Sequence, residues 1–446
     1  PMVEISSTIP GSVTLNTASE PIELTYRTDF VAFSEHLTEE VQIDDSEIVF
    51  AGYGVVAPEY GWDDYKNLDV KGKTVMVLVN DPGFGSWDST LFKGDAMTYY
   101  GRWTYKFEEA ARQGATGVFV IHSTIPAGYP WGVVRNSWNG SGLYLRSQDG
   151  NMSRCAMEGW ITMDVAERIM SNLGEEGLGF RTKARNKDFQ AMNTGVTYSM
   201  NMTNTWKEDV SKNVIAILPG SEHPDEYIIY SAHWDHLGIG IPNEGDSIYN
   251  GALDNASGIS ALLEIAQEFS QIQEKPKRTI VFLAVTAEEQ GLLGSAYYAE
   301  NPVFPPKQTV ANINMDGFYY AGRLKDLTIV GYGQSELEEY AAKAAQKQDR
   351  YIFPDQEASK GYFFRSDHFN FAKKGVPILY ARGGTTDRAH GAEYVTQRNA
   401  DYVKNRYHSP ADEISEDWDL EAAIEDLVLF YKIGKYVADS NEWPQW

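Results

Sequence analysis

Residues 227–238 read Y-I-I-Y-S-A-H-W-D-H-L-G and combine a buried-strand pattern with a cluster of His and Asp. The first half is a short apolar run typical of a buried strand, and the strand ends where His233 and Asp235 follow. In an open α/β sheet, sites form at the carboxyl ends of the strands. His233 can offer one ring nitrogen to a metal while Asp235 accepts the N–H of the other. The alternative is a surface loop with a local His–Asp contact.

Working outward from this stretch, strands alternate with helices from Lys212 to the end of the chain. Apolar runs predict strands at residues 213–220, 278–286, 309–316, 326–330 and 376–380, and helical spacing predicts helices at 255–270, 291–300, 337–346 and 420–437. Such alternation is typical of a mixed, mostly parallel sheet flanked by helices. We therefore expect the α/β fold class, with this domain spanning residues 206–446.

A smaller β-rich domain is expected ahead of the α/β domain. Residues 45–205 give strand, strand, helix and strand, as in I-V-F-A-G-Y-G, G-K-T-V-M-V-L-V-N, residues 100–113 and G-V-F-V-I-H. Residues 1–44 alternate apolar and polar positions, which predicts exposed antiparallel strands. We interpret residues 1–44 as the start of the smaller domain or as a connector to it.

The composition limits the partners. With 63 acidic and 38 basic residues the 446-residue chain carries a net charge of −25, so nucleic acid and anionic membranes are excluded as expected partners. No stretch approaches the roughly 18 to 20 apolar residues of a membrane span. The single cysteine, Cys155, excludes an intrachain disulfide and a thiolate metal site. Any metal must therefore be bound by His and carboxylates.

Three of the predicted strands run directly into acidic residues or His. They are residues 227–235, 280–289 and 311–316, the last ending at Asp316. Burying several carboxylates together is costly unless they share a cation. Glu288 and Glu289 are neighbours whose side chains point in different directions, so one can bind a metal while the other faces a bound water. The alternative for this pair is a solvated run of charge.

Asp254 and His408 complete the candidate set. Asp254 follows a Gly-rich loop and opens a helix, so its alternative role is that of an N-cap. His408 lies in N-R-Y-H-S-P-A-D, which has no apolar stripe to bury it. Two His and three carboxylates without Cys suit zinc, or less readily manganese or cobalt. These ligands and a spare glutamate are too many for one tetrahedral zinc, but two metals sharing a carboxylate and a water use them all.

The sequence resembles the co-catalytic two-zinc exopeptidases of the aminopeptidase Y family, relatives of glutamate carboxypeptidase and the transferrin receptor. The resemblance rests on five motifs in order, H-W-D, L-D-N-A-S-G, A-E-E-Q-G-L-L-G-S, N-M-D and Y-H-S-P-A-D. It implies two Zn²⁺ ions per chain. The implied ligands are His233 and Asp316 on one ion, Glu289 and His408 on the other, and Asp254 bridging both.

The same resemblance implies roles for other residues. Glu288 would act as general base and acid toward a zinc-bridging hydroxide, Asp235 would orient His233, and Tyr407 would donate to the oxyanion. Residues 45–205 are similar to the protease-associated domain inserted in many members. Members with this insert have a helical segment ahead of it, often with an E-G-R-x-x-G-T-like motif, and none precedes Thr17. We expect either processing or truncation of the chain, or helices that are dispensable here.

Four functions are compatible with the residues. We expect an aminopeptidase acting on a peptide or amino-acid derivative, because clustered carboxylates favour a cationic N-terminal amine. A carboxypeptidase or dipeptidase of the same fold would need basic residues for the terminal carboxylate, and Arg382 and Arg365 are the candidates. A one-zinc glutaminyl cyclase and an inactive binding protein are disfavoured by the complete ligand set and by Glu288. The resemblance implies an extracytoplasmic bacterial protein, periplasmic, secreted or surface-anchored, and the sequence predicts no oligomeric state.

Overall fold

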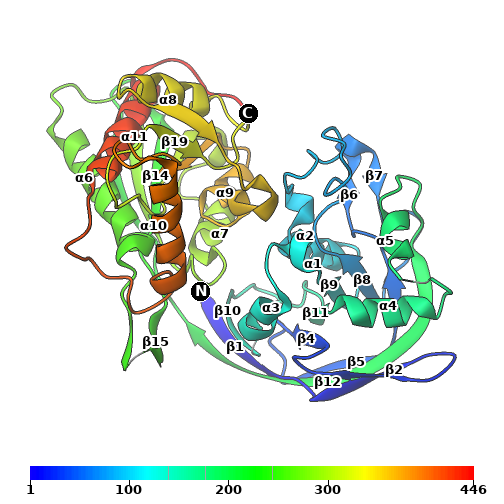
Figure 1. Ribbon diagram of the computed structural model, residues 1–446. Helices are drawn as coiled ribbons and strands as arrows, with labels where there is room; N and C mark the ends of the chain where they lie inside the picture. The colour runs from blue at the N-terminus through cyan, green and yellow to red at the C-terminus, as the bar shows by residue number, and fades with distance from the viewer. Residues whose placement is uncertain (139, 176, 244) are drawn as a thin grey trace. The chain divides into compact units, whose positions relative to one another are not determined.

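The computed structural model describes residues 1–138, 140–175, 177–243 and 245–446, which form two compact units. The first unit comprises residues 1–210 and 357–364, and the second comprises residues 211–356 and 365–446. Residues 1–44 thus belong to the first unit, which ends close to the expected boundary after residue 205. The sequence pattern does not predict that segment 357–364 belongs to the first unit. Figure 1 shows the elements of both units.

The first unit is built on a mixed sheet. Its strands are β1 (Met2–Thr8), β2 (Ser12–Asn16), β3 (Ile22–Thr25), β4 (Phe30–Phe33), β5 (Glu40–Phe50), β8 (Thr74–Leu78), β9 (Gly117–Ile121), β10 (Ser141–Leu145), β11 (Met157–Ile161) and β12 (Met192–Asp209). Their order is β10-β1-β12-β5-β8-β9-β11-β4, with β2 beside β12 and β3 beside β2. A separate ladder joins β6 (Val56–Ala57) to β7 (Trp62–Asp63). Strands β5, β8, β9 and β11 run parallel, and all of β8, β9 and β11 is buried.

Helices cover this sheet because their apolar residues fall on one face. They are α1 (Trp103–Arg112), α2 (Thr124–Ala127), α3 (Trp131–Ser137), α4 (Met163–Ser171) and α5 (Gly179–Ala184). Helix α4 buries Val165, Ala166, Ile169 and Met170, which form one stripe at helical spacing. Its N-cap Thr162 accepts a hydrogen bond from the amide of Val165, which satisfies one of the free amides at the start of the helix.

The second unit is built on a mixed, mostly parallel sheet. Its strands are β13 (Val214–Leu218), β14 (His223–His233), β17 (Arg278–Val285), β18 (Thr309–Asn314), β19 (Asp326–Ile329), β20 (Tyr351–Pro354) and β21 (Ile378–Arg382). They are ordered β13-β17-β14-β18-β21-β19-β20. Strands β17, β14, β18 and β21 are parallel neighbours. β13 runs antiparallel to β17, and β19 runs antiparallel to β21.

Helices flank both faces of the second sheet. They are α6 (Ser257–Gln271), α7 (Leu293–Glu300), α8 (Leu337–Gln346), α9 (His368–Ala372), α10 (Gly391–Asn405) and α11 (Glu421–Asp439). In Figure 1, α6, α8 and α11 lie together on one side of the sheet, and α7 and α9 lie on the other. Tyr230 of β14 donates a hydrogen bond to the carbonyl of Phe430 in α11, 2.9 Å away. The predicted α/β class is confirmed.

Strand register brings the predicted site residues to one edge. His233 is paired with Val285, three residues before Glu288, and Ser231 is paired with Asn314, two residues before Asp316. Because the three strands are parallel neighbours, their carboxyl ends meet at the same edge of the sheet. A hairpin of β15 (Gly238–Asn243) and β16 (Asp246–Tyr249), which the sequence pattern does not predict, follows β14.

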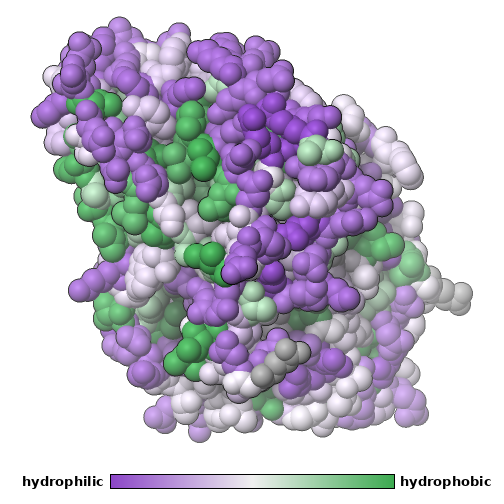
Figure 2. All heavy atoms as spheres, turned by 60° about the vertical axis from the view of Figure 1, so that its left-hand side comes forward, coloured by the Kyte–Doolittle hydropathy of each residue, from purple (hydrophilic) through white to green (hydrophobic). Residues whose placement is uncertain are grey.

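The surface in Figure 2 carries hydrophilic side chains over much of its area, with smaller hydrophobic groups between them. This agrees with the net charge of −25. Among the described residues, we find no helix that is both long and apolar enough to cross a membrane.

Candidate metal centre

His233 ends the buried strand β14, with 1% of its side chain exposed. Its Nε2 lies 3.2 Å from Asp254 Oδ1 and 3.4 Å from Asp316 Oδ1. Its Nδ1 lies 3.0 Å from the main-chain oxygen of Asp235. One ring nitrogen therefore faces acids while the backbone holds the other, which is the usual arrangement of a metal-ligating imidazole.

Asp235 does not orient His233 through its carboxylate in the way that the sequence suggested. That carboxylate lies 3.8 Å from His233 Nδ1. Its Oδ1 instead accepts a hydrogen bond from the amide of Glu288 at 3.0 Å, and its Oδ2 accepts one from the amide of Glu289 at 3.3 Å. Asp235 thereby fixes the backbone of the two glutamates.

The Glu288–Glu289 turn sends its two side chains in different directions. Glu289 Oε2 lies 3.1 Å from His408 Nε2, whereas Glu288 Oε2 lies 4.0 Å from His233 Nε2. Ala287 has a φ of 54°, in the left-handed region. A residue with a side chain adopts this conformation only at a cost, and such sites cluster where a function needs the geometry.

Asp254 stands between the two imidazoles. Its Oδ1 faces His233, and its Oδ2 lies 3.5 Å from His408 Nε2. Its backbone amide donates to Asp412 Oδ2 at 3.1 Å. Helix α6 begins at Ser257 without a side-chain cap, so Asp254 does not serve as its N-cap. The shared position of Asp254 is the one that a bridging carboxylate would take.

His236 is a further member of the cluster, and the sequence reasoning did not single it out. Its Nδ1 lies 2.6 Å from Glu289 Oε1, and its side chain is 7% exposed. Its Nε2 is buried and has no hydrogen-bond partner among the described residues. Gly251 makes room for this ring, since a Cβ there would lie 2.6 Å from His236 Cγ. The second His of H-W-D-H, three positions after the first, was the available signal.

Tyr407 and His408 come just after α10. Their rings stack with centroids 3.9 Å apart. Burial and the charges of Asp254 and Glu289 raise the pKa of the Tyr407 hydroxyl above its usual value. The hydroxyl therefore stays protonated at neutral pH and can donate a hydrogen bond.

The acids and imidazoles of the cluster perturb one another. Burial lowers the pKa of His408, but hydrogen bonds with Asp254 and Glu289 outweigh it and raise this pKa to about 9. Burial raises the pKa of Glu289, but hydrogen bonds with His236 and His408 bring it to about 2. Burial, followed by the charge of Asp316, raises the pKa of Glu288 well above its usual value.

These residues fit divalent cations. Among the described residues, three groups of ligand atoms lie close enough to hold an ion. They are His233 with Asp254 and Asp316, His233 with Glu288 and Glu289, and His236 with Asp254 and Glu289. Asp254 belongs to two of these groups, whose other members differ. Several buried carboxylates that share two or three imidazoles are far more stable with a cation among them.

The two candidate substrate-binding arginines lie outside this cluster of ligand atoms. The Arg382 side chain is exposed, and its guanidinium lies 5.9 Å from the ring centre of Tyr380. The Tyr380 hydroxyl donates to the carbonyl of Asp316 at 3.4 Å, so Arg382 is linked to the cluster through one side chain. Arg365 is partly buried, next to Ser366.

An α/β domain with such a cluster at the carboxyl edge of its parallel strands is an arrangement typical of metal-dependent hydrolases. The sequence model of Peptidase family M28 matches residues 213–431, which contain every member of the cluster. Residues 213–431, just under half of the chain, are therefore similar to this peptidase family.

Individual relatives match shorter parts of the chain. A probable zinc metalloprotease of Pyrenophora teres f. teres is 42% identical over 104 residues, 23% of this chain and 22% of the relative. A glutamate carboxypeptidase 2 homolog of Caenorhabditis elegans is 32% identical over 204 residues, 44% of this chain and 24% of the relative. The chain therefore spans about a quarter of the length of these relatives. An aminopeptidase structure from Aneurinibacillus sp. strain AM-1 aligns over 98% of this chain and 84% of its own, with 19% identity and a TM-score of 0.44.

Proposed function

We propose that this chain is a zinc-dependent exopeptidase that removes the N-terminal residue of a peptide, with two Zn²⁺ ions per chain. The observation that carries the proposal is the position of Asp254, with one carboxylate oxygen on His233 and the other on His408. Asp316 lies on the His233 side and Glu289 on the His408 side. This gives two ligand sets that share one carboxylate.

The bound ions would supply positive charge that polarises the scissile carbonyl and makes water a nucleophile near neutral pH. Glu288 is the free carboxylate beside them, because its side chain has no hydrogen bond among the described residues and is 11% exposed. It takes a proton from the attacking water and gives it to the leaving amine as the C–N bond breaks. Its raised pKa in the metal-free protein falls when cations are near, toward the range of a general base.

The charge of the cluster favours an aminopeptidase. Four carboxylates, Asp254, Glu288, Glu289 and Asp316, gather around His233 and His408. Two divalent ions offset the charge of these four carboxylates, and the further carboxylate of Asp235, 3.8 Å from His233 Nδ1, attracts a protonated amine. Tyr407 supplies a hydroxyl donor beside His408 for the developing oxyanion.

A panel of substrates tests this polarity. The zinc-loaded chain is assayed against aminoacyl amides, N-acetylated peptides, and peptides with a free or an amidated C-terminus. We expect hydrolysis of aminoacyl amides and of free-amine peptides, and loss of activity on N-acetylation. Cleavage that needs a free C-terminus and ignores N-acetylation would overturn the aminopeptidase assignment.

The second candidate is a carboxypeptidase, which the position of Arg382 favours. Its exposed guanidinium next to Tyr380, whose hydroxyl contacts Asp316, lies one side chain away from the cluster. Changing Arg382 to Gln separates the candidates, because a carboxypeptidase would lose affinity for its substrate and an aminopeptidase would not.

A further inference from the structure

Asp254 lies in the segment between β16 and α6, outside the strand ends that carry His233 and Asp316. Its own φ and ψ are not helical, although its two oxygens face His233 and His408. A group that serves a site must be held within about 0.5 Å of the working geometry. Because Asp254 lies neither in the sheet nor in regular helix, other side chains must fix its backbone.

Asp412 holds the amide side of Asp254. This residue is fully buried, and its Oδ2 accepts hydrogen bonds from the amides of Leu253 at 3.2 Å and of Asp254 at 3.1 Å. Its carbonyl accepts another from the amide of Ala252 at 3.0 Å, so three successive amides bind one residue. Asp412 lies four positions after His408. It therefore ties Asp254 to the segment that carries His408.

Asn255 holds the other side of Asp254. The residue is buried, and its Nδ2 donates a hydrogen bond to the carbonyl of Met315 at 3.0 Å. Its Oδ1 accepts one from the amide of Gly317 at 3.1 Å and another from an amide in the first turn of α6. Met315 and Gly317 are the two neighbours of Asp316 in the chain. Asn255 therefore ties Asp254 to the turn that carries Asp316.

The two side chains reach Asp254 from opposite directions. Together they join three segments that carry candidate metal ligands into one hydrogen-bonded network. Their surroundings leave little room for movement, because a Cβ on Gly258 would lie 2.3 Å from Asn255 Oδ1 and 2.6 Å from the Met315 carbonyl oxygen. Neither Asn255 nor Asp412 belongs to a group of ligand atoms that could hold an ion among the described residues.

We propose that Asn255 and Asp412 are positioning residues that hold the Asp254 carboxylate between the two ligand sets. The inference rests on the proposed two-ion centre and names the residues that keep its shared carboxylate in place. Without these bonds the backbone of Asp254 is free to shift. A carboxylate displaced by about 1 Å no longer meets both ions at once, and displacements of this size are enough to disable a site.

Two variants test the proposal, and the first is Asp412→Asn. It keeps the shape of the side chain but has one acceptor oxygen instead of two, so an NH₂ group faces an amide donor. The matched control is Asp326→Asn. Asp326 is also fully buried and accepts hydrogen bonds from two backbone amides and one hydroxyl, but it is not a member of the metal-ligand groups of the described chain.

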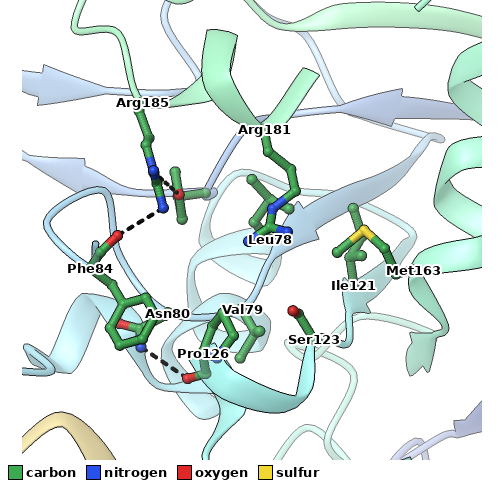
Figure 3. Close-up of a pocket in the computed structure, with 11 residues that line it drawn as sticks. Leu78, Val79, Asn80, Phe84, Ile121, Ser123, Pro126, Met163, Arg181 and Arg185 are labelled. Atoms are coloured by element: carbon green, nitrogen blue, oxygen red, sulfur yellow. Dashed lines mark hydrogen bonds between the residues drawn. The ribbon is translucent and has the colours of Figure 1, made fainter. Parts of the chain in front are cut away.

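The second variant is Asn255→Ala, and its matched control is Asn80→Ala in the first unit. Asn80 is also buried, donates to the Pro126 carbonyl at 2.9 Å, as Figure 3 shows, and accepts from the Asp81 amide at 2.9 Å. Its φ of 70° is a conformation in which Ala is strained. This control should therefore lose at least as much stability as Asn255→Ala.

Three quantities are measured on every protein. Competition with a chelator gives the zinc affinity, the visible absorption of the Co²⁺-loaded protein depends on the geometry of its ligands, and the thermal midpoint reports stability. We expect both variants to bind the more weakly held zinc ion at least tenfold less tightly than the wild type and to change the Co²⁺ absorption. Both controls should keep the zinc affinity and the absorption of the wild type while their thermal midpoints fall.

The outcomes separate this proposal from the proposed function. A wild type that holds two ions, with variants of unchanged zinc affinity and Co²⁺ absorption, would overturn the roles of Asn255 and Asp412 and leave the proposed function standing. Controls that weaken zinc binding as much as the variants do would also overturn these roles. A wild-type chain that binds no zinc would overturn the proposed function and this inference together. If Asn255→Ala does not fold, Asp412→Asn decides by the same criteria.

Discussion

Glu288 is the residue on which the proposed chemistry depends. It is the carboxylate of the cluster that lies close to His233 without a hydrogen bond in the described chain. In Glu288→Gln the metal ligands remain, so zinc content should stay at the wild-type value. Turnover should fall by about 10²- to 10⁴-fold, the range for loss of a general acid–base group.

Metal analysis and kcat measured on the same sample check this prediction. The control is Glu339→Gln, an exposed glutamate on α8, which should leave both quantities unchanged. A metal-loaded Glu288→Gln protein with near wild-type kcat would remove Glu288 from the mechanism.

His236 gives a second prediction at the residue scale. Its Nδ1 holds one oxygen of Glu289 and leaves the other oxygen facing His408. His236→Ala should weaken zinc binding at the Glu289 side by about 10- to 100-fold, as loss of a partner that orients a ligand does. Titration with a zinc-selective chelator measures this. The control is His390→Ala, which removes an exposed His that also contacts an acid, Asp387, and this variant should bind zinc normally. Equal zinc affinities in the wild type, His236→Ala and His390→Ala would contradict the role of His236 in orienting Glu289.

Residue types and strand ends were enough to predict which side chains gather at the edge of the sheet. The structure brings together His233, Asp254, Glu289, Asp316 and His408, the five that the sequence indicated. The hydrogen-bond partner of each side-chain atom could not be predicted, because it depends on backbone geometry. The Asp235 carboxylate is an example, because it accepts hydrogen bonds from backbone amides of the turn after β17. The His233 imidazole contacts the main-chain oxygen of Asp235 instead.

At the scale of elements, the turn between β17 and α7 has no room for an added side-chain atom at Gly294. A Cβ on Gly294 would lie 2.2 Å from the Thr286 carbonyl oxygen and 2.6 Å from its amide nitrogen, both backbone atoms. Gly294→Ala must therefore push α7 away from β17 and move Glu288 and Glu289 with the turn.

We expect Gly294→Ala to lower the free energy of unfolding by about 1 to 3 kcal/mol, the usual cost of overpacking, and to weaken zinc binding. Chemical denaturation and zinc titration test the two effects. The control is Gly132→Ala, because a Cβ at that helical position meets nothing within 4 Å and should be neutral or slightly stabilising. Wild-type stability in Gly294→Ala would show that the turn tolerates the displacement.

The elements that the sequence predicted well are those with a clear apolar period. The helix predicted at 337–346 matches α8, and that at 420–437 lies within two residues of α11. Helix α10 could not be predicted because Val395 is its one buried residue among those described, so it has no apolar stripe. That helix delivers His408, which the sequence placed in a loop-like passage.

For the whole molecule, zinc binding should be coupled to proton release. In the metal-free protein the acids raise the pKa of His408 to about 9, and hydrogen bonds with Asp254 and Asp316 raise that of His233 further, against the effect of burial. Both imidazoles are therefore protonated at pH 7 and must lose their protons to bind a cation.

We expect zinc uptake at pH 7 to release on the order of two protons per chain. Zinc affinity should rise with pH through about 9, the pKa of His408, and continue to rise above it because the pKa of His233 is raised further. Calorimetry in buffers with different ionisation enthalpies counts these protons. A binding enthalpy that is independent of the buffer would contradict the raised pKa values.

The division into two units was only partly accessible from the sequence. The expected boundary after residue 205 and the change of pattern at Lys212 lie on either side of residue 210, where the first unit ends. Segment 357–364 escaped prediction because its short 3₁₀ turns carry no apolar period that links it to residues 1–210. The similarity of residues 45–205 to a protease-associated domain stays a prediction.

Metal content shows whether shared cations hold the cluster of acids and imidazoles together. The full chain is purified, dialysed against trace zinc and analysed by inductively coupled plasma mass spectrometry. The protein with both ligand sets intact should hold two zinc ions per chain, and Asp254→Ala, which removes the shared carboxylate, should hold fewer than two. A wild-type chain that retains no zinc, or an Asp254→Ala chain that still holds two, would contradict the account.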